Sequence, residues 1–78
     1  MEKRYVPVVV RIDENGKKEP KVIEFEDKKY LIDKILERGP AACQSVGGVG
    51  IKYTCRVLGQ ITELWEEKEQ WFVVVKQP

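Results

Sequence analysis

The sequence has 78 residues, with 14 basic and 13 acidic side chains and a net charge of +1. That length suits one domain with a modest core, and that charge lacks the strongly basic character of a nucleic-acid-binding domain. The longest apolar runs are short, and Pro7 interrupts the first of them, so we expect neither a membrane span nor a signal peptide. An apolar fraction of 42% rich in Val, Ile and aromatic residues favours a folded domain over disorder, although 35% of the residues are charged.

The first hairpin is predicted at Asn15-Gly16, because both residues tolerate the positive φ angles of a two-residue turn. With these residues at the tip, Val8 faces Ile23 and Val6 faces Phe25. All four apolar side chains then share one face of the pair. The turn and the hydrophobic pattern therefore predict the same antiparallel pairing.

A second turn over residues 26–29 leads into residues 30–38, a segment with two interpretations. Its apolar residues have helical spacing, but some of them also share one face of a strand. Because about nine residues without an N-cap are short for a helix, we expect a strand, with one helical turn around residues 31–37 as the alternative. We expect Gly39-Pro40 to end the segment.

Residues 39–50 form a glycine-rich stretch that lacks the spacing of a phosphate-binding P-loop. Lys52 does not follow a glycine directly, and the next residues predict a strand rather than the helix that would hold the anion. We interpret the stretch as a long connection whose glycines permit positive φ or the close approach of another backbone. The alternative is a loop site, a nest of backbone amides for an anion, at Gly47, Gly48 and Gly50.

The third hairpin is predicted at Gly59-Gln60, because glycine suits the first central position of a type II′ turn. This register pairs Arg56 with Glu63 and Lys52 with Glu67. The last strand, residues 71–75, is apolar on both sides. Its two faces group as follows: Leu64, Trp71, Val73 and Val75 on one, and Trp65, Phe72 and Val74 on the other.

Together these hairpins predict a mainly β fold, a single antiparallel meander of about five to six short strands. At this length we expect the meander to curl into a small SH3-like barrel or a strongly twisted sheet, which limits its open edges. Residues 1–78 then form a single small β domain.

The side chains that most catalytic and metal sites need are missing. There is no histidine, and Ser45, the only serine, has no imidazole to activate it. Cys43 and Cys55 have no companion ligands for zinc, so we expect no catalytic residue, no metal site and no cofactor. We expect Cys55 to be a core residue. Cys43 lies in a loop, where a reactive thiol is the alternative to an inert one. Glu66 is the carboxylate that points inward, and we expect it to reach water at a strand end.

The absence of an export signal indicates reduced thiols and a cytoplasmic location, with a Cys43–Cys55 disulfide as the alternative. The runs GGVGIKYTCRV (residues 47–57), YLIDKIL (residues 30–36) and WFVV (residues 71–74) resemble a group of small uncharacterised bacterial proteins. The resemblance extends from about Val6 to Val75. It implies a free-standing small β protein of the bacterial cytoplasm, and it carries over no catalytic residue.

We therefore expect a non-catalytic protein-interaction module or a homo-oligomer, with no membrane partner. Its interaction surface is predicted on the second apolar face, at Trp65, Phe72 and Val74. The partner is then another protein or a second copy of the chain. The alternative is a small barrel that binds single-stranded nucleic acid through Arg38, Lys52 and Arg56. The charge balance and the expected pairing of Lys52 and Arg56 with glutamates argue against nucleic acid.

Overall fold

The computed structural model describes residues 2–42 and 49–75, and these residues form seven antiparallel strands and no helix. The strands are β1 (Glu2–Tyr5), β2 (Val8–Ile12), β3 (Lys18–Phe25), β4 (Lys28–Ala42), β5 (Val49–Val57), β6 (Gln60–Glu67) and β7 (Gln70–Val75). The mainly β antiparallel fold is thus confirmed, with seven strands instead of the predicted five to six. The prediction of a strand over residues 30–38 is confirmed, and the alternative of a helical turn around residues 31–37 is wrong, because β4 runs through that segment. Within the described ranges, no helical segment has the length and hydropathy of a membrane span.

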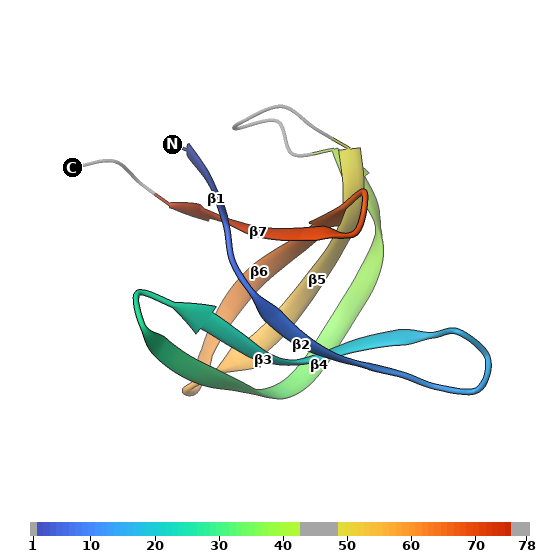
Figure 1. Ribbon diagram of the computed structural model, residues 1–78, viewed down its shortest axis with the longest axis horizontal. Coiled ribbons are helices and arrows are strands. Elements are labelled where there is room, and N and C mark those ends of the chain that lie inside the picture. The colour runs from blue at the N-terminus through green and yellow to red at the C-terminus, as the bar shows by residue number, and fades with distance from the viewer. Residues whose placement is uncertain (1, 43–48, 76–78) are drawn as a thin grey trace.

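The sheet follows the order β1-β7-β6-β5-β4-β3-β2 and curls into a half-barrel (Figure 1). Only Val6 and Pro7 separate β1 from β2, although these two strands stand at opposite ends of that order. The Val6 N–H donates to the carbonyl of Trp71 on β7, and the Glu24 N–H on β3 donates to the carbonyl of Pro7, each at 2.9 Å. One short segment therefore bonds to both ends of the sheet and fixes the predicted curl.

The first hairpin confirms the predicted pairing of Val8 with Ile23. Its turn is longer than predicted, because Ile12 pairs with Lys18 and the loop spans residues 13–17. A bulge in β3, where Lys21 has no counterpart on β2, then shifts the register by one residue and restores the predicted alignment.

The helical spacing of residues 30–38 comes from two bulges in β4. The register shifts between Ile32 and Lys34, and again between Ile35 and Glu37. Each shift adds one residue to β4 that has no counterpart on β5. Side chains that point inward are therefore three residues apart along β4 but two residues apart along β5. The pairs are Ile32 with Val57, Ile35 with Cys55, and Arg38 with Tyr53.

The expectation that Gly39-Pro40 ends this segment is also wrong. Pro40 pairs with Ile51, and the ladder continues to Ala42. Among the described residues, β4 pairs with β5 alone beyond Leu31, so this part of β4 is an edge. An edge strand tolerates a proline because its missing N–H can face away from the ladder.

The third hairpin turns at Leu58-Gly59 instead of Gly59-Gln60. Leu58 has a φ of 51° and Gly59 a φ of 75°, so both central residues are left-handed. The pairing moves by two residues, and Arg56 lies opposite Ile61. A shift of two keeps every side chain on its predicted face. It makes two predicted cross-strand pairs wrong: Arg56–Glu63 and Lys52–Glu67.

Two apolar layers form on the two faces of the sheet, as predicted for the last strand. The concave face holds the main core: Val6, Ile23, Tyr53, Cys55, Leu64 and Trp71. The convex face holds a smaller cluster of Trp65 and Phe72, against which Ala41 and Val74 pack.

Gly50 allows β5 to approach β6 closely. A Cβ at this position would overlap the carbonyl oxygen of Glu66. The close-approach interpretation is therefore confirmed for Gly50, whereas Gly47 and Gly48 of the predicted loop site lie outside the described residues.

Candidate functional site

Charged groups close one end of the half-barrel interior. The Nζ of Lys18 on β3 donates to the Oε2 of Glu66 on β6 at 2.7 Å. Arg38 donates to the carbonyl of Lys18 at 2.7 Å, and its guanidinium lies 5.8 Å from the ring centroid of Tyr53. The hydrogen bond from Lys18 to Glu66 raises the pKa of that lysine, so the Lys18 side chain carries its positive charge at neutral pH. Glu66 points inward as predicted, but it is only 9% exposed and is held by Lys18 instead of reaching bulk water.

The opposite end of the interior opens into an apolar cleft with a volume of about 470 Å³. Its walls come from the β3–β4 and β5–β6 hairpins and from β7. The lining residues are Ile23, Phe25, Tyr30, Val57, Leu58, Gln60, Thr62, Val73, Val74 and Val75. None of them is charged. The volume falls within the range of about 300–1,000 Å³ that is typical of ligand pockets.

The cleft exists because β6 and β7 diverge soon after their turn. Their pairing consists of Trp65 with Phe72, Glu66 with Trp71, and Glu67 with Gln70. In the part of the chain that the structure describes, Gln60–Leu64 pairs with β5 alone, and Val73–Val75 pairs with β1 alone. The facing edges of the two strands are therefore open to each other.

A second recess lies on the convex side of the same divergence. Its volume is about 430 Å³, and it is lined by Ile61, Thr62, Glu63, Trp65, Val73 and Val74. Val73, Val74 and Thr62 line both cavities. The cleft and the recess thus occupy the two faces of one gap in the sheet.

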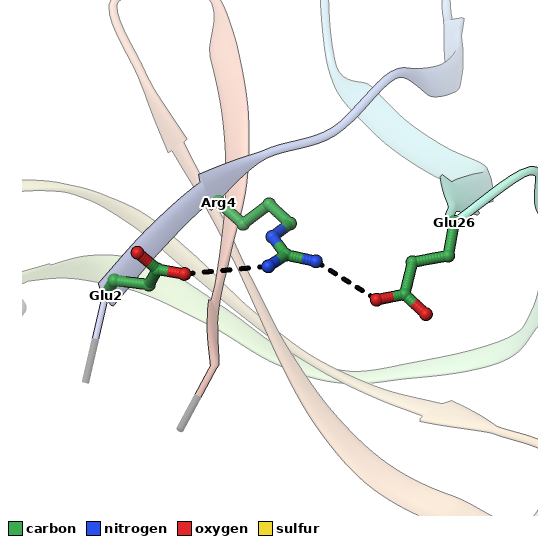
Figure 2. A network of polar contacts seen from close by, with 3 residues as sticks. All are labelled: Glu2, Arg4 and Glu26. Atoms are coloured by element: carbon green, nitrogen blue, oxygen red, sulfur yellow. Dashed lines mark hydrogen bonds and ion pairs between the residues drawn. The ribbon is translucent and has the colours of Figure 1, made fainter. Parts of the chain in front are cut away.

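Arg4 on β1 lies beside Phe25, one of the residues that line the cleft. Figure 2 shows its guanidinium between two carboxylates, 3.5 Å from the Oε1 of Glu2 and 3.1 Å from the Oε1 of Glu26. The guanidinium also lies 5.3 Å from the ring centroid of Phe25. Because Glu26 belongs to the β3–β4 turn, Arg4 joins β1 to that turn across the concave side.

The aromatic members of the predicted interaction surface are buried within the chain. Trp65 is 6% exposed and Phe72 is 1% exposed, and their rings stack at 5.9 Å. The Tyr5 ring meets Phe72 edge-on at 5.8 Å, and the Nζ of Lys3 lies 4.8 Å from the Phe72 centroid. Val74, the third predicted residue, is half-buried and lines both cavities. The predicted surface thus adjoins the cleft through Val74.

The three basic residues proposed for nucleic acid do not share a face. Arg38 points to the concave side, whereas Lys52 and Arg56 lie two pleats apart on the convex face of β5. The Nζ of Lys52 is 3.4 Å from the Oε2 of Glu63 and 5.9 Å from the Trp65 ring centroid. Lys52 therefore has a carboxylate partner, although not the predicted one.

Cys55 is the core residue that the sequence predicts. It is fully buried, and its Sγ donates to the carbonyl of Tyr53 at 3.5 Å. Burial raises the pKa of the thiol to about 11, so the reactive thiolate does not form at neutral pH. Cys55 is a free thiol, which excludes the Cys43–Cys55 disulfide, and Cys43 itself lies outside the described residues. Over residues 2–42 and 49–75, no group of three or more potential metal ligands comes together.

The cleft is the part of the site that the sequence did not predict. Ile23 and Phe25 are identifiable as inward-facing, but no pattern shows that the sheet leaves them open at one end. The available signal is a pair of apolar residues beside a turn, Leu58 and Ile61, which are 75% and 60% exposed.

Comparisons with protein-family models, with curated proteins and with solved structures found no match to this chain. The resemblance to small bacterial proteins therefore stays a prediction. What the geometry itself defines is a small β half-barrel that is closed by an ion pair at one end and open through an apolar cleft at the other.

Proposed function

We propose that this chain is a non-catalytic protein-interaction module and that its partner protein binds at the apolar cleft. The observation that carries the proposal is the uncharged lining of this cavity of about 470 Å³ at the end of the core. Leu58, an exposed lining residue, extends the apolar surface at the cleft, and the exposed Ile61 lines the recess on the other face of the same gap. A cavity surrounded by exposed apolar side chains is typical of an interface.

The proposal includes a bacterial cytoplasmic location for the module. The family resemblance and the free thiol of Cys55 support this location. The partner is a second protein, and self-association into a homo-oligomer is the variant of the proposal that a measurement of solution mass distinguishes.

Single-stranded nucleic acid is the alternative ligand, on the convex face. Tyr5, Phe72 and Trp65 form a row there, with Lys3 and Lys52 at its sides. Of these rings only Tyr5, at 50% exposure, is open to stack on a base. Lys3 also forms an ion pair with Glu67 at 3.1 Å, so we rank this alternative second.

The test is selection from a phage-displayed library of random heptapeptides against the purified protein. We expect apolar peptides whose binding is lost in Leu58→Asn and retained in Val9→Lys. Asparagine tolerates the positive φ of residue 58 and removes the apolar wall, so the fold is kept. Val9 is an exposed apolar residue of β2 outside the cleft, which makes it the matched control.

The absence of selectable peptides, or equal binding to Leu58→Asn and wild type, contradicts the proposal. A labelled mixed oligonucleotide tests the alternative, which predicts binding that weakens steeply with salt.

A further inference from the structure

We propose that the partner binds as an added β-strand that pairs with the open edge of β6 and places every second side chain in the cleft. This inference rests on the proposed function and specifies how the partner binds. Strand addition gains affinity from main-chain hydrogen bonds and specificity from pockets for alternate side chains. The gap between β6 and β7 provides both features.

The first argument is the direction of the backbone groups on β6. The two-residue turn at Leu58-Gly59 makes Val57 and Gln60 the first hydrogen-bonded pair of the hairpin. Because such pairs alternate along an antiparallel ladder, the N–H and C=O groups of Ile61 and Glu63 face away from β5. They point into the gap, and within the described ranges no strand pairs with them there.

The opposite wall of the gap follows the same alternation. The Trp71 carbonyl accepts from the Val6 N–H on the β1 side of β7. Residues 72 and 74 therefore turn their backbone groups toward β6. Phe72 pairs with Trp65 on that side, whereas Val74 has no partner on β6 among the described residues and faces the gap. An extended segment is the ligand whose donors and acceptors repeat with this spacing.

The second argument is the chemistry of the two cavities. A strand beside β6 continues the pleat, so its inward side chains enter the cleft, where Phe25, Tyr30 and Val57 supply apolar contacts. Its outward side chains lie over the convex recess, where Glu63 is the one charged lining residue. The partner segment is therefore extended and apolar at every second position, whereas Glu63 already has Lys52 as its partner.

This chemistry favours another protein over a second copy of the chain. If β6 of a second copy paired with this edge, its Gln60 and Thr62 would point into the cleft. Burying these polar side chains in a cleft with a mostly apolar lining is less favourable than burying apolar ones, which opposes that pairing.

The test compares two variants of Ile61 for affinity to a peptide selected against the wild type. Ile61→Pro removes the N–H that faces the gap, and the β5–β6 ladder does not use that N–H. Ile61→Ala removes most of the side chain and keeps the N–H. We expect proline to weaken binding about tenfold or more and alanine to weaken it less than about threefold, as loss of main-chain pairing predicts.

A second measurement does not depend on whether the proline variant folds. The selected peptide carries a ¹³C-labelled carbonyl, and its infrared band is recorded free and bound to the wild-type protein. We expect the band to move to the β-sheet position on binding. A band that stays at the unordered or helical position overturns strand addition.

The outcomes separate this inference from the proposed function. If a peptide loses affinity for Leu58→Asn but binds Ile61→Pro and Ile61→Ala equally well, strand addition is overturned. The proposal of an interaction module at the cleft then still stands. Failure to select any peptide overturns both. A solution mass that doubles with concentration and falls to the monomer value in Ile61→Pro assigns the edge to a second copy and overturns the choice of partner.

Discussion

Raising the pH is expected to weaken the fold through the buried thiol of Cys55. Burial raises the pKa of this thiol from 9.0 to about 11. The folded-state pKa therefore lies above the unfolded one, so the contribution of the thiol to stability is fully present below about pH 9. It is lost as the pH rises toward 11, because only the unfolded chain gives up its proton in that window.

The size of the effect follows from the shift in pKa. One unit corresponds to about 1.4 kcal/mol, so the free energy of unfolding falls by about 2 to 3 kcal/mol between pH 9 and 11. That is a large fraction of the stability expected of a domain this small. The assay is urea unfolding followed by tryptophan fluorescence, with reductant present, at steps from pH 7.5 to 11.

Cys55→Ala is the matched control, because alanine removes the titrating group. Its cavity lowers stability by an amount that does not depend on pH. Tyr53 and Lys18 also have raised pKa values, so their loss of protons at high pH lowers the unfolding free energy of both proteins. This contribution is shared by wild type and Cys55→Ala and cancels in the comparison. Parallel pH profiles for wild type and Cys55→Ala would refute the reasoning.

Three further predictions concern the strands around the two ends of the interior. Gly50→Ala should cost about 1–3 kcal/mol of unfolding free energy, because its Cβ meets the β6 backbone, whereas Gly39→Ala, with open space at its Cβ position, should be near neutral in urea unfolding. Glu66→Gln should lower the urea midpoint, and that loss should disappear above the raised pKa of Lys18; a loss that persists there contradicts the ion pair. Leu58→Asn should raise the free energy of unfolding by about 1 kcal/mol, since asparagine tolerates the positive φ, and a lower melting temperature would contradict this.

Local patterns in the sequence predicted most of the strands and their faces, although the structure has seven strands instead of five to six. Alternation placed Trp65 and Phe72 on one face and Trp71 on the other, and the structure confirms that division. It was also sufficient for the first hairpin, where Val8 pairs with Ile23 even though the turn is longer than predicted. Side-chain period depends only on the local pleat, which is why these predictions hold.

Features that depend on distant contacts were not predictable in the same way. A bulge turns Ile32 and Ile35, which are three residues apart, to the same face of β4. This spacing of apolar residues is the same as in a helical turn. The turn at Leu58-Gly59 places a leucine at positive φ, against its intrinsic preference. The cleft arises from the divergence of β6 and β7, which the curl of the whole sheet determines and no local pattern encodes.

Amide hydrogen exchange at residues 61–63 tests the open edge of β6 most directly. In the free protein we expect fast exchange at Ile61 and Glu63, whose N–H groups face the gap, and slow exchange at Thr62, whose N–H faces β5. Addition of a selected peptide should slow exchange at Ile61 and Glu63 and leave Thr62 unchanged. Slow exchange at all three amides in the free protein, or no added protection with peptide bound, would contradict the account.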